Sequence, residues 1–306
     1  MKSFITGIDG FIGSWLTTLL LKKKDRVSGL SRKEGKSSQG LITKYAGDVL
    51  DNENITQIIN KTEPNRIFHL AAQSNIPYSF SHPQETMETN VRGTLNLLEA
   101  VKQKKRKTIF LSVGSSSEYG LTAFKNHFLS EDDPLSPMNP YAVSKMAQGQ
   151  LCRIYREAHH LDIIHVRPFA IIGPGKKGDA ISDFCRGIVA IERGEKKFLS
   201  VGNLSHARDF LDVRDVVRAM DIISSKENHY PIYNLCSGTE IKLENILEIL
   251  ISMSKIKIII KKDPQKTRPA DDPFIIGNPK RLSSLGFKPK YKIEQTLSDI
   301  LEYWRN

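Results

Sequence analysis

Tyr141 and Lys145 stand four residues apart in a stretch that reads as a helix, where positions i and i+4 share one face. A lysine ammonium beside a phenol favours the phenolate, so the phenol can exchange protons nearer neutral pH than its reference pKa of about 10 allows. Ser115 lies earlier, in a serine-rich turn. The Tyr-x-x-x-Lys spacing is also common on exposed helix faces, so its context decides what it means.

A glycine-rich turn near the start of the chain supplies that context. Residues 2–6 read as a short buried strand, and Gly7, Gly10 and Gly13 follow in the spacing G-x-x-G-x-x-G, directly before an apolar helical stretch. Such glycines permit a tight turn, close approach of the backbone to a diphosphate, and close packing of helix on strand. The helix N-terminus then presents free N–H groups to the anion. The pattern predicts a dinucleotide-binding turn.

The end of the second expected strand bears on which dinucleotide is bound. NAD binding usually places a carboxylate there, on the ribose 2′-hydroxyl, whereas the 2′-phosphate of NADP needs cationic partners. The chain has Arg32 and Lys33 at this point and no acid. Because a guanidinium can bind phosphate in a bidentate way, the sequence favours NADP(H), with NAD(H) left open. Asp48, after the third expected strand, could accept from the adenine amino group.

The fourth expected strand ends in small and apolar residues. Leu70, Ala71 and Ala72 would let a cofactor pass close to the backbone. We interpret the neighbouring His69 as a packed or hydrogen-bonded core histidine rather than a catalytic one.

Ser115, Tyr141 and Lys145 together match the needs of a ketone reduction. That reaction requires a hydride donor, a proton donor for the developing alkoxide, and a group that orients the oxygen. A reduced dinucleotide, Tyr141 and Ser115 could supply these, while Lys145 would tune Tyr141 and hydrogen-bond the nicotinamide ribose. For Ser116 and Ser117, turn formation is as good an explanation as a role in the site.

Length and composition limit the classes of function. A chain of 306 residues with 39% hydrophobic content can bury a large core in one big domain or two joined ones. No run approaches the roughly 18 apolar residues of a membrane span, and the first residues read as a strand rather than a signal peptide. Three widely spaced cysteines form no disulfide or metal pattern, which fits a reducing cytoplasm. The cysteine spacing gives no reason to expect a metal, and because the net charge of +11 is dispersed we expect no nucleic-acid or membrane partner.

Strands and helices alternate through the first half of the chain. Strands separated by helices of this size predict the α/β class, with a Rossmann-type doubly wound parallel sheet that binds its ligand at the carboxyl ends of the strands. After the first strand, the expected strands are 26–30, 41–46, 66–70, 108–113 and 163–166, and the expected helices are 52–60, 84–103 and 140–159.

Beyond Pro168 the elements become shorter. This part is too fragmented for a second Rossmann unit, so we expect a smaller C-terminal α/β substrate-binding cap. The predicted division is 1–168 for the NADP(H)-binding domain and 169–306 mainly for the cap, with the chain crossing between them within 200–240. The expected elements are helices 181–193, 213–223 and 243–252, strands 208–211, 231–235 and 256–261, and two short helices after a charged loop at 262–279.

Several motifs together resemble the extended short-chain dehydrogenase/reductase family of nucleotide-sugar enzymes, over nearly the whole chain. They are Thr6-Gly7-Ile8-Asp9-Gly10-Phe11-Ile12-Gly13, His69-Leu70-Ala71-Ala72, Asn90-Val91-Arg92-Gly93-Thr94, Tyr141-x-x-x-Lys145 and Arg167-Pro168-Phe169. Within that family, other segments look most like GDP-6-deoxy-4-keto-mannose reductases and the related GDP-mannose dehydratases. Among these segments are Val113-Gly114-Ser115-Ser116, Gly173-Pro174-Gly175, Val201-Gly202-Asn203-Leu204, the stretch from Arg208 to Ala219, and Arg268-Pro269-Ala270-Asp271.

The resemblance completes the expected binding sites. It implies a GDP-linked 4-keto sugar, with Arg208 and Arg268 on the diphosphate, Asp271 facing a ribose and Arg186 assisting. The expected substrate-binding set is Ser74, Ser115, Ser116, Arg186, Asn203, Arg208, Arg268 and Asp271. The expected cofactor-binding set is Gly7, Gly10, Phe11, Ile12, Gly13, Arg32, Asp48, Val49, Leu70, Ala71, Ala72, Asn90, Tyr141, Lys145 and Pro168.

Two positions depart from the family pattern. The 4,6-dehydratases of the family carry an extra acid two residues before the tyrosine of their Tyr-Gly turn, which helps to eliminate water. Here Ser117 stands at that position, and Glu118 is one residue out of phase. The family also often has asparagine where Ala170 stands, in contact with the sugar nucleotide. The first change argues against dehydration, and the second leaves the identity of the sugar open.

We therefore expect a cytoplasmic, NADPH-dependent reductase of the 4-keto group of a nucleotide-linked, GDP-linked 4-keto-6-deoxyhexose, in deoxysugar (GDP-rhamnose) biosynthesis. A homodimer through the helices 84–103 and 140–159 is the expectation from the family. The main rival is a nucleotide-sugar C4 epimerase with tightly bound NAD, which uses the same serine, tyrosine and lysine. A GDP-mannose 4,6-dehydratase and a non-catalytic dinucleotide-sensing or nucleic-acid-binding protein fit the residues less well.

Overall fold

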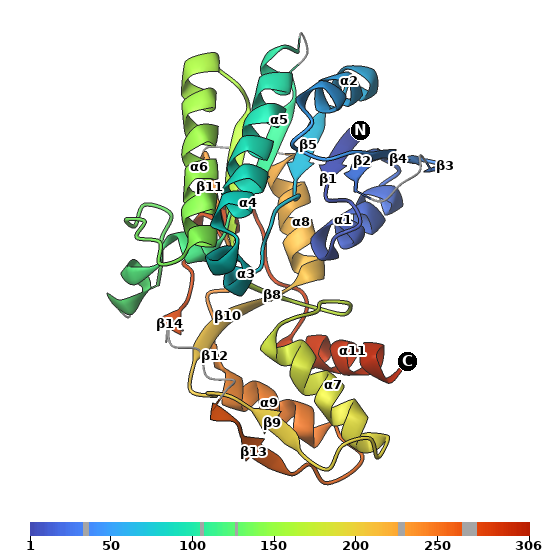
Figure 1. Ribbon diagram of the computed structural model, residues 1–306, viewed down its shortest axis with the longest axis vertical. Coiled ribbons are helices and arrows are strands. Elements are labelled where there is room, and N and C mark those ends of the chain that lie inside the picture. The colour runs from blue at the N-terminus through green and yellow to red at the C-terminus, as the bar shows by residue number, and fades with distance from the viewer. Residues whose placement is uncertain (33–36, 105–106, 126–127, 226–229, 265–273) are drawn as a thin grey trace.

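The computed structural model describes residues 1–32, 37–104, 107–125, 128–225, 230–264 and 274–306. Figure 1 shows a larger unit, in which helices flank a sheet, and a smaller unit beyond the ends of its strands. The large sheet has eight strands in the order β11-β7-β6-β5-β1-β2-β4-β3, all parallel except β3. In that order they span Ile232–Leu235, Ile163–Pro168, Ile109–Val113, Arg66–His69, Lys2–Thr6, Arg26–Ser31, Ile42–Ala46 and Ser37–Gln39.

Consecutive residues of the central strands pack on opposite faces of this sheet, because side chains alternate along a strand. Ile5 and Phe68 join the core on one face, whereas Phe4 and Ile67 join the core on the other. Both faces are apolar and helices cover both, as a parallel sheet requires. The first face carries α1 (Phe11–Lys22) and α8 (Val213–Ile223), and the second carries α2 (Asn52–Thr62), α5 (Gly93–Lys102) and α6 (Pro140–His159).

The smaller unit surrounds a separate apolar core. Its sheet has the order β12-β10-β14, with β8 also paired to β10, and a two-stranded sheet joins β13 to β9. Helices α7, α9 and α11 pack against one another around this core. The strands are β8 (Ala170–Ile172), β9 (Leu199–Val201), β10 (Ala207–Asp212), β12 (Glu240–Lys242), β13 (Ile260–Lys262) and β14 (Phe274–Ile275), and the helices are α7 (Ala180–Glu192), α9 (Leu243–Ser252), α10 (Lys280–Ser284) and α11 (Ile293–Arg305).

Elements from the second half of the chain return to complete the large unit. Helix α8 packs on the same face as α1, and β11 pairs in parallel with β7, with Tyr233 opposite Val166. The expected fold class, a Rossmann-type doubly wound sheet with a smaller C-terminal α/β unit, is confirmed. The division into 1–168 and 169–306 stays a prediction. Within the described ranges, no helix combines the length and apolar content of a membrane span.

The differences from the expected elements are local. The helix expected at 84–103 is α4 (Pro83–Met87), a π-helical turn at Glu88–Arg92, and α5 in succession. The strand expected at 256–261 is replaced by the three-residue strand β13, Ile260–Lys262. The sequence patterns missed helix α3 (Ile76–Ser81) and strands β3, β8, β9, β12 and β14, which are too short to show a period of their own.

A buried charge cluster lies at the starting ends of β1 and β5. Arg66, 2% exposed, donates to the carboxylates of Asp25 at 2.7 Å and Asp221 at 2.8 Å, and to the hydroxyls of Ser3 and Ser224. Burial would raise the pKa of Asp25, but hydrogen bonds from the N-terminal ammonium of Met1, from Arg66 and from Ser3 hold it below its ordinary value. The guanidinium therefore joins the end of α1, the start of β5 and the end of α8.

Replacing Arg66 by methionine should lower the free energy of unfolding by about 3 kcal/mol or more, because two buried carboxylates lose their shared cation. Urea denaturation followed by circular dichroism measures the change. Arg153→Met is the matched control, since Arg153 forms an exposed pair with Glu157 and its loss should cost about 0.5 kcal/mol or less. Equal losses in the two variants would contradict the prediction.

Candidate active site

A cavity of about 1810 Å³ opens at the carboxyl ends of the central strands, where the small unit meets the large one. The turns after β1, β5 and β6 form one wall, and the loop after β8 forms part of the other. Most of the expected site residues line it: Gly7, Gly10, Phe11, Ile12, Gly13, Arg32, Asp48, Val49, Leu70, Ala71, Ala72, Ser74, Ser115, Ser116, Tyr141, Lys145, Pro168 and Arg208.

The glycine turn after β1 leaves no room for side chains. Gly7 has a φ of +69°, and a Cβ there would lie 3.0 Å from the amide nitrogen of Ala71. A Cβ on Gly13 would lie 2.3 Å from the carbonyl oxygen of Gly7. Gly10 is the N-cap of α1 and has no side chain to satisfy the first N–H groups of the helix. This cradle of backbone donors fits the diphosphate of a dinucleotide.

Charged side chains stand where the turn meets the second strand. Arg32 is exposed at the rim of the cavity. Asp9, within the glycine turn, accepts from the Ser31 hydroxyl and pairs with the Lys44 ammonium on β4, which offsets its charge. Asp48 accepts from the amide of Leu50 at 2.9 Å, so its carboxylate also holds its own turn. Because Lys44 offsets the charge of Asp9, that carboxylate does not oppose the binding of a phosphate group at Arg32.

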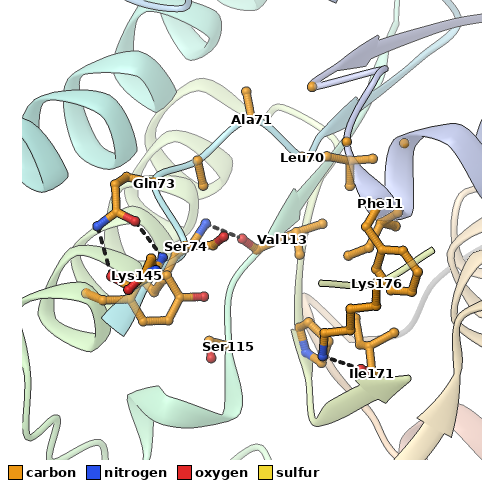
Figure 2. Close-up of a pocket in the computed structure, with 18 of the residues that line it drawn as sticks. Phe11, Leu70, Ala71, Gln73, Ser74, Val113, Ser115, Lys145, Ile171 and Lys176 are labelled. Carbon is orange, nitrogen blue, oxygen red and sulfur yellow. Dashed lines mark hydrogen bonds between the residues drawn. The ribbon is translucent and has the colours of Figure 1, made fainter. Parts of the chain in front are cut away.

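Helix α6 carries Tyr141 and Lys145 into the cavity in its first two turns. Asn139 caps the helix by accepting from the Ala142 amide at 2.8 Å, and Pro140 occupies the first turn. Tyr141 is 8% exposed and Lys145 is 4% exposed. The Lys145 side chain reaches the end of β6 (Figure 2), and Tyr141, one turn earlier on the same helix, lines the same cavity, as the i and i+4 spacing predicts.

Burial shifts the pKa of both members of this pair. Burial raises the pKa of Tyr141 to about 12, and a hydrogen bond with the Ser115 hydroxyl opposes this only in part. The Lys145 ammonium donates instead to the carbonyl of Val113 at 2.8 Å (Figure 2). It also donates to the side chain of Gln148 at 2.9 Å. Burial lowers the pKa of Lys145 to about 8. Burial therefore favours the neutral phenol in this structure, and the Lys145 ammonium bonds a strand carbonyl and Gln148; the tuning of Tyr141 by Lys145 stays a prediction.

Ser115 is fixed by its own turn. Its hydroxyl accepts from the Ser117 amide at 3.1 Å, and its amide donates to the Glu118 carboxylate at 2.9 Å. Glu118 is fully buried and lies behind the cavity wall, where it contacts His165 and Arg167. Ser116 and Ser117 line the cavity, whereas Glu118 does not. The position of the dehydratase acid is thus occupied by a serine, and the nearby glutamate faces away.

Asn90, expected to contact the cofactor, supports the wall from behind. It is fully buried, exchanges hydrogen bonds with the backbone of Gln73 at 2.8 and 2.9 Å, and donates to the Ser144 hydroxyl at 2.8 Å. The π-helical turn at Glu88–Arg92 places it between the loop after β5 and helix α6. His69 is a hydrogen-bonded core histidine as expected, held between the Thr6 and Thr94 hydroxyls.

Two of the expected substrate ligands lie outside the cavity lining. Arg186 is on the solvent side of α7, with its guanidinium 5.4 Å from the Trp304 ring, because the opposite face of the helix packs into the small core. The side chain of Asn203 is hydrogen-bonded to nearby residues: its amide nitrogen lies 3.2 Å from His206, and its carbonyl oxygen accepts from Ser205. Arg268 and Asp271 fall outside the described residues, as does Lys33.

The loop after β8 contributes residues that the motifs did not single out. Lys176 and Lys177 line the cavity, and the Trp15 indole on α1 donates to the Pro174 carbonyl at 3.2 Å, joining the two units. Figure 2 shows the Lys176 side chain reaching the carbonyl of Ile171 across from Phe11. The paired lysines within the glycine-rich stretch 173–178 were the available signal.

Comparisons with known proteins agree with this geometry. The family model described as GDP-mannose 4,6 dehydratase matches residues 4–300. A GDP-6-deoxy-D-mannose reductase of Pseudomonas aeruginosa is 32% identical, over 100% of this chain and 97% of that protein. A GDP-mannose 4,6-dehydratase of Vibrio cholerae is 25% identical, over 98% of this chain and 92% of its own length.

Solved structures are similar over the same extent. The structure of RMD from Pseudomonas aeruginosa complexed with NADPH has a TM-score of 0.86 at 30% identity, covering 100% of this chain and 99% of that one. UDP-glucose 4-epimerase of Thermus thermophilus in complex with NAD has a TM-score of 0.88 at 23% identity, over 100% of this chain and 99% of that one, and shows the shared fold. The chain therefore belongs to the GDP-mannose 4,6 dehydratase family of the extended short-chain dehydrogenases/reductases.

Proposed function

We propose that this protein is an NADPH-dependent reductase of the 4-keto group of a nucleotide-linked 4-keto-6-deoxyhexose, with GDP as the nucleotide. The observation that carries the proposal is one cavity in which Ser115, Tyr141 and Lys145 stand beside a glycine turn shaped for a dinucleotide diphosphate. The 32% identity with a GDP-6-deoxy-D-mannose reductase over the whole chain supports this substrate class.

The residues of the site have separate tasks in this proposal. NADPH, when bound, supplies the hydride. Tyr141 holds a proton on its hydroxyl at neutral pH, because burial raises its pKa to about 12, and delivers it to the oxygen that gains charge. Ser115 orients that oxygen through its hydroxyl. Lys145, protonated below its pKa of about 8, presents its ammonium to the nicotinamide ribose.

The cofactor and the sugar nucleotide would lie at different parts of the cavity. Gly7, Gly10 and Gly13 hold the dinucleotide diphosphate, with Arg32 at the 2′-phosphate. Val49, Leu70, Ala71, Ala72 and Pro168 give the remaining cofactor surface, and Ser74, Ser116 and Arg208 face the sugar nucleotide. Arg268 and Asp271 keep their proposed place on the nucleotide from the family pattern alone.

The arrangement at the Tyr119-Gly120 turn argues against dehydration. Ser117 lines the cavity where an acid would be needed, and its hydroxyl is a far weaker acid than a carboxyl group. Glu118 is held ionised, because His165, Arg167 and the Ser115 amide lower its pKa to about 2 although burial opposes them. Reduction needs neither group as an acid, so it survives this change.

Two further properties belong to the proposal. We infer a homodimer through the helices at 84–103 and 140–159, where Val143 and Ile154 of α6 are exposed. Analytical ultracentrifugation would test the oligomeric state. We also infer a cytoplasmic location, with which the three buried free cysteines agree. Detection of the tagged protein in the soluble or membrane fraction of its own cells tests this second property.

The purified protein should oxidise NADPH when GDP-4-keto-6-deoxymannose is added and should produce one GDP-6-deoxyhexose diastereomer, identified by NMR. Absorbance at the nicotinamide band measures the rate, and the dTDP- and UDP-linked 4-keto sugars serve as comparison substrates. A tightly retained NAD together with interconversion of C4 epimers, without net oxidation of NADPH, would favour the epimerase instead.

Tyr141→Phe should lower kcat by about 100-fold or more, because the proton donor is lost, while the Kd for NADPH changes little. Stopped-flow kinetics and fluorescence titration measure the two quantities. Tyr155→Phe is the matched control, since Tyr155 lies on the same helix and its hydroxyl bonds to Glu99 outside the cavity lining. A fully active Tyr141→Phe enzyme would exclude this mechanism.

Arg32→Ala should raise the KM for NADPH about 10-fold or more and leave the KM for NADH nearly unchanged, because only NADPH carries the 2′-phosphate. Steady-state kinetics with both cofactors give the ratio. Arg26→Ala provides the control at the opposite end of β2, where the side chain is also exposed. A similar effect of Arg32→Ala on both cofactors would remove Arg32 from cofactor selection.

A further inference from the structure

A run of buried side chains connects Lys145 to the strand behind it. The Lys145 ammonium donates to the carbonyl of the Gln148 side chain at 2.9 Å, and the Gln148 amide donates to the Ser112 hydroxyl at 2.8 Å. Ser112 lies on β6 and contacts Nδ1 of His165 on β7 at 3.2 Å. Lys145 is therefore linked to the sheet through side chains as well as through its bond to a strand carbonyl.

The same run continues to Ser115. Nε2 of His165 lies 3.1 Å from Oε1 of Glu118, and that oxygen also accepts from the Ser115 amide at 2.9 Å. We name this set the Lys145–Ser115 network; its members are Lys145, Gln148, Ser112, His165, Glu118 and Ser115. Each member is between 0% and 8% exposed, so water does not compete for these hydrogen bonds.

Two glycines make space for the network. A Cβ on Gly114 would lie 2.1 Å from the Glu118 carboxylate and 2.3 Å from the His165 ring. A Cβ on Gly149 would lie 2.9 Å from Nε2 of the same ring. Neither glycine has a positive φ, so these positions need glycine because a side chain would not fit, and not because of backbone conformation.

The hydrogen bonds of the network run in one direction when His165 is neutral. Glu118 is ionised and can only accept, so Nε2 of His165 carries a proton. An imidazole protonated at Nε2 can accept at Nδ1 from the Ser112 hydroxyl, whose oxygen accepts from Gln148. With the imidazole in that tautomer, donors point from the ammonium toward the carboxylate at every step. Bonds arranged head to tail polarise and strengthen one another.

Arg167 holds the negative end of the network. Its Nε donates to Oε2 of Glu118 at 2.9 Å, and its Nη1 donates to the Tyr119 hydroxyl at 3.1 Å and the Glu131 carbonyl at 3.2 Å. Glu118 thus uses one oxygen for Arg167 and the other for the network. Because Arg167 is on β7, the carboxylate is fixed to the sheet and not only to its own turn.

We propose that Gln148, Ser112, His165 and Glu118 are positioning residues, which act as one unit to hold Ser115 and Lys145 in their catalytic places and to keep Lys145 protonated. The catalytic part of this inference rests on the proposed reductase function, whereas the effect on Lys145 does not. The ionisable groups around Lys145 are Glu118, His165 and His69 from the sheet side and Tyr141 and Cys152 on its own helix.

The first test is the ionisation of Lys145 itself. In protein labelled with [ε-13C]lysine, Ser112→Ala should lower the pKa of Lys145 by about half a unit to one unit, because the oriented acceptor behind Gln148 is lost. The Lys145→Met spectrum assigns the resonance. Ser224→Ala is the control, since it also removes a buried hydrogen-bonded hydroxyl, but in the Arg66 cluster at the opposite ends of the strands. An equal pKa in the two variants would overturn the proposal.

The second test is kinetic and asks whether the residues act together. Ser112→Ala and Glu118→Gln should each lower kcat about three- to tenfold at pH 8 and move the alkaline limb of its pH profile to lower pH. The double variant should lose little more than the worse single variant, because one unit is broken in both. If the two single-variant losses of kcat multiply in the double variant and the pH profile does not move, the residues have only a structural role. That result would refute the proposal.

The two tests keep the two proposals apart. A wild-type protein that reduces no keto sugar would exclude the reductase, and the NMR titration would still decide whether the network controls Lys145. Thermal unfolding of every variant shows whether Glu118→Gln folds. If the Glu118→Gln variant does not fold, the Ser112→Ala variant alone decides. A reduced kcat together with an unchanged pKa of Lys145 in that variant would contradict the proposed role of the network.

Discussion

Parallel strands end at the same edge of a sheet, and the site depends on that constraint. The turns after β1, β5 and β6 meet there because the three strands are neighbours in the sheet. The first turn brings the glycine cradle, the second brings small residues, and the third brings Ser115. Helix α6 then needs only an N-cap at Asn139 to deliver Tyr141 and Lys145 to the same edge. The chemistry is assembled from segments distant in the chain because the strand directions agree.

The sequence patterns were sufficient where one element determines its own structure. Strand β1, helix α6 and helix α8 have the bounds that their periodicity indicated, and the glycine turn has the conformation that its spacing requires. The patterns failed where the structure of a segment depends on contacts with residues far away in the chain. Strands such as β8 and β14 have three residues or fewer and exist because β10 lies beside them. Asn90 was expected to contact the cofactor from its family motif, but its side chain is hydrogen-bonded to the backbone of Gln73 behind the cavity wall.

Burial changes the meaning of charged residues in this protein. The net charge of +11 suggests a cationic surface, yet the ion pairs that organise the fold lie inside it. Arg66 connects the residues at the starting ends of β1 and β5. At the carboxyl ends, the Arg167–Glu118 pair fixes the turn after β6. The same burial keeps Tyr141 neutral and brings the pKa of Lys145 close to physiological pH. Sequence spacing indicated that the two residues share one face of helix α6, but the direction of their pKa shifts depends on the low-dielectric surroundings.

The return of α8 and β11 to the large sheet has a consequence for synthesis on the ribosome. When the first 168 residues have emerged, the outer edge of β7 has no neighbour and the apolar face beside α1 has no cover, because both partners are still to be translated. An open strand edge next to exposed apolar surface invites association with other chains. We therefore expect a fragment that ends after β7 to leave that strand edge and the apolar face beside α1 uncovered, until β11 has been translated.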